Sequence, residues 1–350
     1  MPNRSTFFHH LHPVMLPARE SRFRYTFGLG GLSVFLFVVL ALTGALELFY
    51  YIPSLDAANK SVQTITFFVP YGWLIRGLHF WAAQALVMIV ILHLLRVTFT
   101  GSYKAPRRFN WLLGVSLLAA VLLLDFSGYA LKWDSDIAWA LLVGTNLLKS
   151  IPLIGSGLYG ALVGGQEIGP DTVVRFYGWH IFGLALIAFC VIAWHIFRVR
   201  RDGGISHEPD RSNNLPAVDA IARPARISRN ILVQREALAM LIATIVLLAL
   251  TLFFPPAIGG QVNFAQSPVE ATAPWFFIWI QQLLRWGDPF VMGVLLPIGL
   301  LILLALIPYL IDRSQTGVAR WFNREGRFAQ VVVVLIVVLM VSLTIVGAMQ

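Results

Sequence analysis

The chain has 350 residues, of which 58% are hydrophobic and only 12% are charged. This composition excludes a soluble globular protein and indicates a membrane protein built from several apolar helices. The formal net charge is +9, and the single cysteine, Cys190, lies within an apolar run. A disulfide framework and a cysteine metal site are therefore excluded.

Apolar runs of about 20 residues, the length needed to cross a bilayer, recur along the chain. Before the first of them, residues 1–27 are basic and aromatic and lack the pattern of a cleaved signal, so we expect an interfacial helical segment there. The sequence predicts an all-α membrane protein with seven spans, at 28–51, 73–97, 111–131, 174–199, 236–254, 289–311 and 328–348.

The segments between the spans differ in character. Residues 132–172 are expected to form two short helices, at 136–148 and within 150–165, and 255–288 a short helix across the outer surface. The hydrophilic stretch 201–235 is predicted to be a cytoplasmic linker. It separates a four-helix domain, 28–200, from a three-helix domain, 236–350.

Basic residues fall mainly in alternate connecting segments. The segments before the first span and after the second, fourth and sixth spans contain 20 of the 26 Lys and Arg residues. The positive-inside rule therefore places the amino terminus in the cytoplasm. The positive charge is thereby explained by topology, and we expect no nucleic-acid partner.

Two predicted spans contain one histidine near either end. His79 and His93 are 14 residues apart in the second span, and His180 and His195 are 15 apart in the fourth. Both intervals are close to four helical turns, so the two histidines of a span can face one direction, roughly 21 Å apart. The two spans run in the same direction and so offer two stacked pairs of imidazoles, one towards each membrane face.

Paired imidazoles suit a haem iron, which takes two axial ligands. A single histidine in a membrane helix is more often a hydrogen-bonding residue, but two matched pairs in apolar surroundings indicate ligation. Gly30 and Gly44 in the first span, and Gly114 and Gly128 in the third, repeat the 14-residue interval. They would let a porphyrin approach the backbone, although glycine also serves ordinary helix packing. We therefore predict a four-helix dihaem bundle.

Several motifs occur in a characteristic order: LGG at 29–31, RGLH at 76–79, GYALKWD at 128–134, SIPLIG at 150–155, RFYGWH at 175–180 and HIFRVRRDGGIS at 195–206. Over almost the whole chain this arrangement resembles cytochrome b of the Rieske/cytochrome b complexes. The 15-residue second histidine interval is similar to that of the plastid and Gram-positive branch. The three-helix part resembles that branch's separate subunit IV, here fused.

The resemblance implies the cytochrome b subunit of a quinol:cytochrome c oxidoreductase-type complex that transfers electrons between outer and inner quinone sites and contributes to proton translocation. An outer, low-potential haem b is expected between His79 and His180, and an inner, high-potential haem b between His93 and His195. The implied partners are a Rieske iron–sulfur protein, a c-type cytochrome or equivalent subunit, quinone, the lipid bilayer and a second copy of the chain. The implied location is the bacterial inner membrane.

Three positions depart from the family pattern. Gly28 stands where the plastid branch attaches an extra haem through cysteine, so no covalent extra haem is expected. Lys132 replaces the proline of Gly-Tyr-x-Leu-Pro-Trp. The Pro-Glu-Trp-Tyr signature falls on 273–276, so Pro274 stands where the family has the glutamate that accepts a quinol proton.

Three acids are candidates to accept that proton instead. Glu270 matches another acid of the family, and Asp125 and Glu47 lie near the outer ends of their spans. An acid inside lipid is costly and marks a proton path more often than a structural contact. The alternative for Asp125 and Glu47 is an ion pair with Lys132 or Arg76.

Three further residues are assigned to the outer site. Arg76, one turn before His79, is predicted to bond a haem propionate, the alternative being an arginine that snorkels to the interface. Trp275 and Phe276 are predicted to wall the outer quinone pocket, unless they are ordinary interfacial aromatics.

Two other functions remain open from the sequence. One is a dihaem quinone-reducing membrane anchor that serves a non-Rieske electron donor and has a degenerate outer quinol site. The other is a haem-free transporter whose histidines relay protons.

Overall fold

Seven membrane-spanning helices dominate the computed structural model, which describes residues 15–18, 22–205, 226–262 and 272–350. Because each has the length and apolar composition to cross a bilayer, the predicted all-α architecture with seven spans is confirmed for the described residues. The spans are α3 (Leu29–Glu47), α5 (Gly72–Phe99), α6 (Arg108–Leu131), Pro170–Arg201, α11 (Arg229–Phe253), Val291–Ile311 and α14 (Arg327–Ala348).

Two of these spans are composite. The fourth consists of α9 (Pro170–Gly178), the π-helical turn η2 (Trp179–Leu184) and α10 (Ala185–Arg201). The sixth consists of η6 (Val291–Leu295), α13 (Leu296–Leu306) and η7 (Ile307–Ile311). Single π turns inside helices occur frequently at functional sites, and η2 contains His180.

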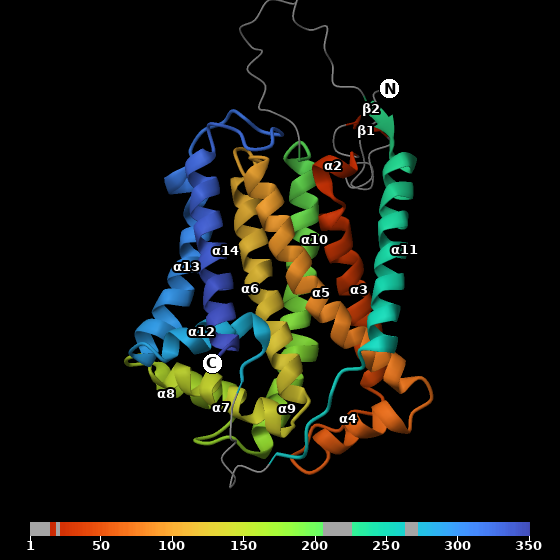
Figure 1. Ribbon diagram of the computed structural model, residues 1–350, viewed down its shortest axis with the longest axis vertical. Helices are drawn as coiled ribbons and strands as arrows, with labels where there is room; N and C mark the ends of the chain where they lie inside the picture. Colours follow the sequence, from red (N-terminus) through yellow and green to blue (C-terminus); the bar gives the residue numbers. More distant parts are fainter. Residues whose placement is uncertain (1–14, 19–21, 206–225, 263–271) are drawn as a thin grey trace, which may run out of the picture.

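Short elements cover the two ends of the bundle (Figure 1). At the end opposite the amino terminus, which the sequence predicts to be the outer end, lie α4 (Ala58–Phe67), α7 (Ser135–Lys149), α8 (Gly155–Val163), and η5 (Trp275–Phe277) with α12 (Ile278–Leu284). The short helices predicted at 136–148, in 150–165 and in 255–288 are thus confirmed. Helix α4 was not anticipated by the sequence analysis.

The amino-terminal segment differs from the helix expected over 1–27. Its described part contains the strand β1 (Met15–Pro17) and the single helical turn α2 (Phe23–Thr26), and 1–14 and 19–21 lie outside the described residues. Strand β1 pairs antiparallel with β2 (Arg226–Ser228), which precedes α11. This pairing keeps 15–17 extended, because its backbone hydrogen bonds are made between strands rather than within a helix.

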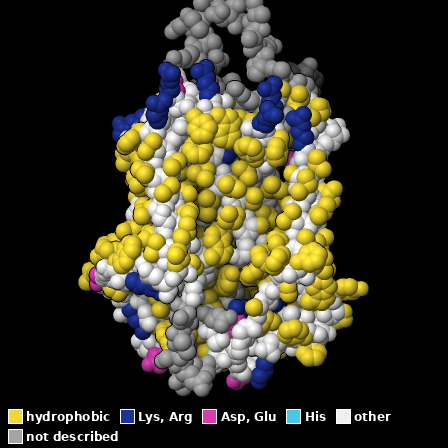
Figure 2. Space-filling view, viewed as in Figure 1, with side chains coloured by type: hydrophobic (Ala, Val, Ile, Leu, Met, Phe, Trp, Pro, Cys, Tyr) yellow, Lys and Arg dark blue, Asp and Glu magenta, His cyan; other side chains and the backbone are white. Residues whose placement is uncertain are grey.

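The spans pack as a four-helix bundle with the remaining three on two sides. Helix α3 packs along α5, and α6 packs along α10. Helix α11 lies against α3 and α5, whereas α13 contacts α6 and α14 contacts α5 (Figure 1). Hydrophobic side chains cover the middle of the visible face, and Lys and Arg gather towards its ends (Figure 2). The chain is a multi-pass integral membrane protein.

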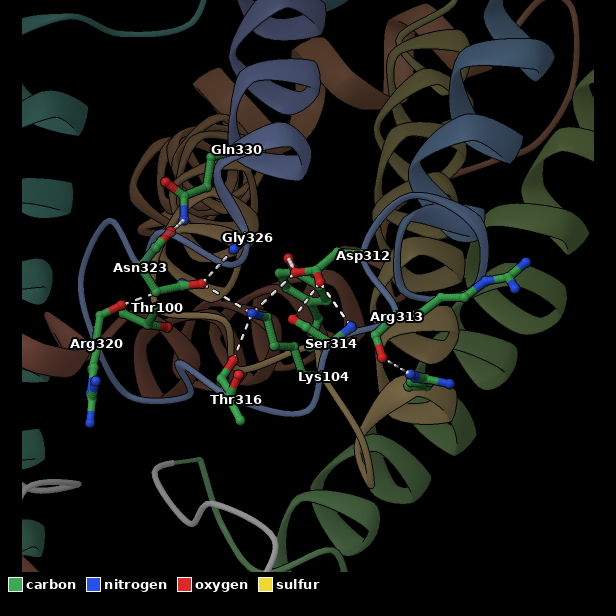
Figure 3. Close-up of polar contacts among 12 residues, drawn as sticks. Thr100, Lys104, Asp312, Arg313, Ser314, Thr316, Arg320, Asn323, Gly326 and Gln330 are labelled. Atoms are coloured by element: carbon green, nitrogen blue, oxygen red, sulfur yellow. Dashed lines mark hydrogen bonds and ion pairs between the residues drawn. The ribbon is translucent and has the colours of Figure 1, made fainter.

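A buried polar network joins the loop after α5 to the loop before α14 (Figure 3). Lys104, which is fully buried, lies 3.2 Å from Asp312 Oδ2 and donates to Thr316 O at 2.8 Å and Asn323 Oδ1 at 3.0 Å. We call these four residues the polar clamp. They connect the four-helix part to the last two spans at the amino-terminal end of the bundle.

Candidate functional site

His79 of α5 and His180 of η2 face each other near the outer end of the bundle. Their ring centres are 6.4 Å apart, and the ring planes are inclined by 65°. Two metal–nitrogen bonds of about 2 Å, with about 1.1 Å from each nitrogen to its ring centre, require about 6 Å. The pair therefore has the separation needed to bind one metal ion from both sides.

Hydroxyl groups fix the orientation of both rings. Thr43 Oγ1 lies 2.9 Å from His79 Nδ1, and Ser127 Oγ lies 3.0 Å from His180 Nδ1. The Thr43 hydroxyl donates its own proton to Val39 O, and the Ser127 hydroxyl donates its own proton to Leu124 O. The hydroxyls must therefore accept from Nδ1–H, which leaves Nε2 as the basic atom.

The four glycines lie against the four histidines. A Cβ at Gly44 would be 3.0 Å from His79 Cε1, and one at Gly128 would be 2.9 Å from His180 Cε1. At the other level, Gly30 faces His93 at 3.4 Å and Gly114 faces His195 at 3.6 Å. The glycines thus provide space for imidazole rings, whereas the sequence analysis assigned that space to the porphyrin.

The inner histidines have a different environment. His93 and His195 interact electrostatically with each other, and the Nδ1 atom of each is buried without a hydrogen-bond partner among the described residues. No hydroxyl corresponds to Thr43 or Ser127, because Gly30 and Gly114 both follow leucine. Hydroxyl groups therefore hold the imidazoles of the outer pair but not those of the inner pair.

A cavity of about 450 Å³ surrounds the outer histidine pair. Its walls are mainly apolar, and His79, His180, Gly44 and Gly128 are among the lining residues. Paired imidazoles whose Nδ1 atoms bond to hydroxyls, which leaves Nε2 for a metal, and mainly apolar walls fit a porphyrin with two axial ligands. The residues present thus suit the cofactor predicted from the sequence.

Arg76 also lines this cavity, but its guanidinium group binds backbone. Its Nη1 donates to Pro256 O at 3.0 Å and its Nη2 to Ala257 O at 3.2 Å. The side chain is buried against the connection that follows α11. The propionate contact remains a prediction.

The outer connection after α11 is fastened by several residues that the sequence analysis missed. Trp81 Nε1 donates to Phe254 O at 2.9 Å, and Asp134 Oδ2 accepts from Gly259 N at 2.8 Å. Lys132 lies 2.8 Å from the same carboxylate oxygen. The polar character of Lys132 thus serves the contact with Asp134 at the position where the family has proline.

Two of the candidate acids line the cavity. Asp125 Oδ2 and Glu47 Oε1 are buried without hydrogen-bond partners among the described residues. Among the described residues no ion pair within 4.0 Å joins Glu47 to Arg76, whose guanidinium binds Pro256 O and Ala257 O instead. Glu270 lies outside the described residues.

The two predicted aromatic wall residues contact the bundle. Phe276 is buried, with its ring centre 6.0 Å from that of Tyr129 on α6. Trp275 Nε1 donates to Gln84 Oε1 on α5 at 2.7 Å. The motifs gave Gln84 and Tyr129 no role, although Tyr129 lies within GYALKWD and Gln84 is five residues after His79.

Comparisons with known proteins agree with this architecture. The family model "Cytochrome b/b6/petB" matches residues 8–203, more than half of the chain, and "Cytochrome b(C-terminal)/b6/petD" matches 261–350. The chain is 38% identical over 177 residues to cytochrome b6 of Heliomicrobium gestii, covering 51% of this chain and 83% of that protein.

A solved structure is similar over nearly the full length. A chain of a structure described as a hyperthermophilic respiratory Complex III superposes with a TM-score of 0.79 at 25% sequence identity. The match covers 93% of this chain and 84% of that chain. With its b6-type part and its subunit IV-type part fused in one polypeptide, this chain belongs to the cytochrome b/b6 family.

Proposed function

We propose that this chain is the cytochrome b subunit of a quinol:cytochrome c oxidoreductase-type complex, with two haem b groups, one between His79 and His180 and one between His93 and His195. The observation that carries the proposal is the outer pair of imidazoles, 6.4 Å apart and each bound through Nδ1 by a hydroxyl. When bound, the haems supply a one-electron path between the outer and inner quinone sites.

The protein's own residues fix the ligands and supply polar groups at the outer site. Thr43 and Ser127 orient the outer imidazoles, and Asp125, Glu47 and Glu270 are the candidates to accept quinol protons in place of the family's glutamate. Trp275 and Phe276 wall the quinol pocket. Inward electron flow and proton uptake at the inner site then contribute to proton translocation.

The cysteine content of the chain supports a separate iron–sulfur subunit, and the other partners in this proposal come from the family resemblance. Cys190 is the only cysteine, so a cysteine-ligated iron–sulfur cluster must belong to another subunit. We propose a Rieske protein and a c-type cytochrome or equivalent as partners, a homodimer as the assembly, and the bacterial inner membrane, with a cytoplasmic amino terminus, as the location.

Optical spectroscopy of the purified protein tests the haem assignment. The native chain should show b-type bands in the reduced-minus-oxidised spectrum, and His180→Leu or His93→Leu should each remove about half of them because one axial ligand is lost. His207→Leu, which changes a histidine between the fourth and fifth spans, is the control and should leave the bands intact.

Two outcomes would decide against the proposal. A colourless native protein would support the haem-free transporter instead. Unchanged bands in both His180→Leu and His93→Leu would show that these histidines are not the ligands.

A second function is favoured by Pro274 and Lys132, which replace family residues at the outer site. In this alternative the chain is a dihaem quinone-reducing anchor for a non-Rieske donor. The subunit composition of the isolated complex and a stigmatellin-type inhibitor distinguish the two functions. A Rieske subunit and inhibited quinol oxidation support the main proposal, whereas inhibitor-resistant turnover at the inner site supports the anchor.

A further inference from the structure

Gln84 is a buried glutamine whose amide is only half satisfied. Gln84 is 8% exposed. Its Oε1 accepts a hydrogen bond from Trp275 Nε1, whereas its Nε2 has no hydrogen-bond partner among the described residues. A buried amide N–H without a partner is destabilising, so such a group in a membrane helix requires an explanation.

Gln84 does not lie on the side of α5 from which His79 faces His180. It lies five residues after His79, about 7.5 Å further along α5 and about 140° around the helix. Gln84 lines the cavity of the outer histidine pair and at the same time contacts Trp275 of η5. It therefore stands between the cavity and the segment that walls the proposed quinol pocket.

Asp125 and Tyr129 complete a polar wall beside this amide. Asp125 is 7% exposed, and its Oδ2 also lacks a partner among the described residues. Tyr129, one turn later on α6, lines the same cavity, and its ring packs against Phe276. An amide donor, a carboxylate acceptor and a phenol thus line the cavity around the outer histidine pair, and two of them, Gln84 and Tyr129, also contact Trp275 and Phe276.

This combination matches one class of ligand. A hydroquinone has an apolar ring and two hydroxyl groups, each of which both donates and accepts hydrogen bonds. Aromatic side chains contact such a ring, an amide N–H donates to its oxygen, and a carboxylate accepts from the hydroxyl hydrogen.

We propose that Gln84 is a quinol-binding residue of the outer site: its Nε2 donates to a hydroquinone oxygen and directs the hydroxyl hydrogen towards Asp125. The inference rests on the proposed function and extends it to a residue that the sequence analysis left unassigned. Trp275 is a positioning residue in this arrangement, because its indole N–H holds the amide oxygen and leaves Nε2 for the ligand.

Steady-state kinetics of the isolated complex, with all its partner subunits, test the inference. The substrate is a short-chain hydroquinone, and the variants are Gln84→Leu and Gln84→Met, the second of which keeps the length of the side chain. One lost hydrogen bond to bound substrate should raise KM about tenfold and lower kcat less. Trp275→Phe, which keeps an aromatic ring but removes the indole N–H together with the five-membered ring, should raise KM by a smaller factor.

Gln330→Leu is the matched control. Gln330 is also a buried glutamine on a spanning helix, but its Nε2 donates to Asn323 O near the polar clamp. Its loss should lower thermal stability without changing KM. A stability loss shared by Gln84→Leu and Gln330→Leu, with a KM effect confined to Gln84, supports the inference.

An unchanged KM in Gln84→Leu or Gln84→Met, with normal b-type bands, would overturn the inference and leave the proposed function standing. Absent b-type bands in the native complex would instead overturn the proposed function itself.

Discussion

At the scale of single residues, the outer histidine pair depends on neighbours that contact it across helices. Thr43 and Ser127 immediately precede Gly44 and Gly128, so each outer glycine brings a hydroxyl to the imidazole that it faces. A hydrogen bond to the second ring nitrogen fixes the tautomer and strengthens the ligand. The hydroxyl–glycine pair is a sequence signal that predicts which of the two histidine pairs has hydrogen-bonded Nδ1 atoms.

The glycines of the outer level should be less tolerant of substitution than those of the inner level. Gly128→Ala places a Cβ 2.9 Å from His180, whereas Gly114→Ala places one 3.6 Å from His195, an ordinary contact. We expect Gly128→Ala to lower the low-potential haem content severalfold and Gly114→Ala to leave haem content unchanged. Redox titration of the b-type absorbance measures both, and equal haem contents in the two variants would contradict this prediction.

Loss of one hydroxyl should act on the outer level alone. Thr43→Val keeps the shape of the side chain but leaves His79 Nδ1 without its partner, which typically costs about 10- to 100-fold in metal affinity. We expect weaker retention of the outer haem during purification, and unchanged inner bands. Ser33→Ala is the control, because the Ser33 hydroxyl donates to Leu29 O of its own helix.

At the scale of elements, the polar clamp fixes the loop before α14 on the loop after α5. Burial by itself raises the pKa of Asp312, but hydrogen bonds from Ser314 and Tyr103 and the charge of Lys104 outweigh it and keep the pKa below its ordinary value. Asp312 therefore stabilises the folded state as a carboxylate at neutral pH. That contribution is lost as the pH falls through the folded-state pKa.

Asp312→Asn should destabilise the protein because it leaves the buried Lys104 ammonium without its counter-ion, which costs about 3–5 kcal/mol. We expect a clear fall in melting temperature at pH 7. The difference in melting temperature between the variant and the native protein should become smaller as the pH falls towards about 3. Asp202→Asn, which breaks a pair with Arg198 at one helix end, should cost less than about 1 kcal/mol. A difference in melting temperature between Asp312→Asn and the native protein that does not change with pH would contradict the stabilising role of the Asp312 carboxylate.

At the scale of the whole molecule, the four-helix part and the last three spans meet at several separate places. Helix α11 packs on α3 and α5, β1 pairs with β2, and the polar clamp joins the loops at the same end. The family models likewise match two regions of the chain, 8–203 and 261–350. Because these contacts join the two parts at several places, we expect them to hold the parts together without an intact linker.

A chain divided within 206–225 should therefore assemble from two co-expressed pieces. We expect the two pieces to copurify and to retain both b-type centres, because the interfaces of α11, α13 and α14 with the bundle are preserved. Copurification on a tag placed on one piece measures this. The same division in the Asp312→Asn background should give a lower yield, and separate purification of the native pieces would disprove the prediction.

The sequence by itself determined the seven spans and the heights of the four histidines, because bilayer thickness fixes the length of an apolar run and helical periodicity fixes which residues share a face. Contacts between distant segments were decided only by the tertiary structure. Trp275 meets Gln84 across 191 residues of chain, and the guanidinium of Arg76 reaches backbone 180 residues away. No local period encodes such pairings, since they depend on how helices rotate and cross when their side chains pack.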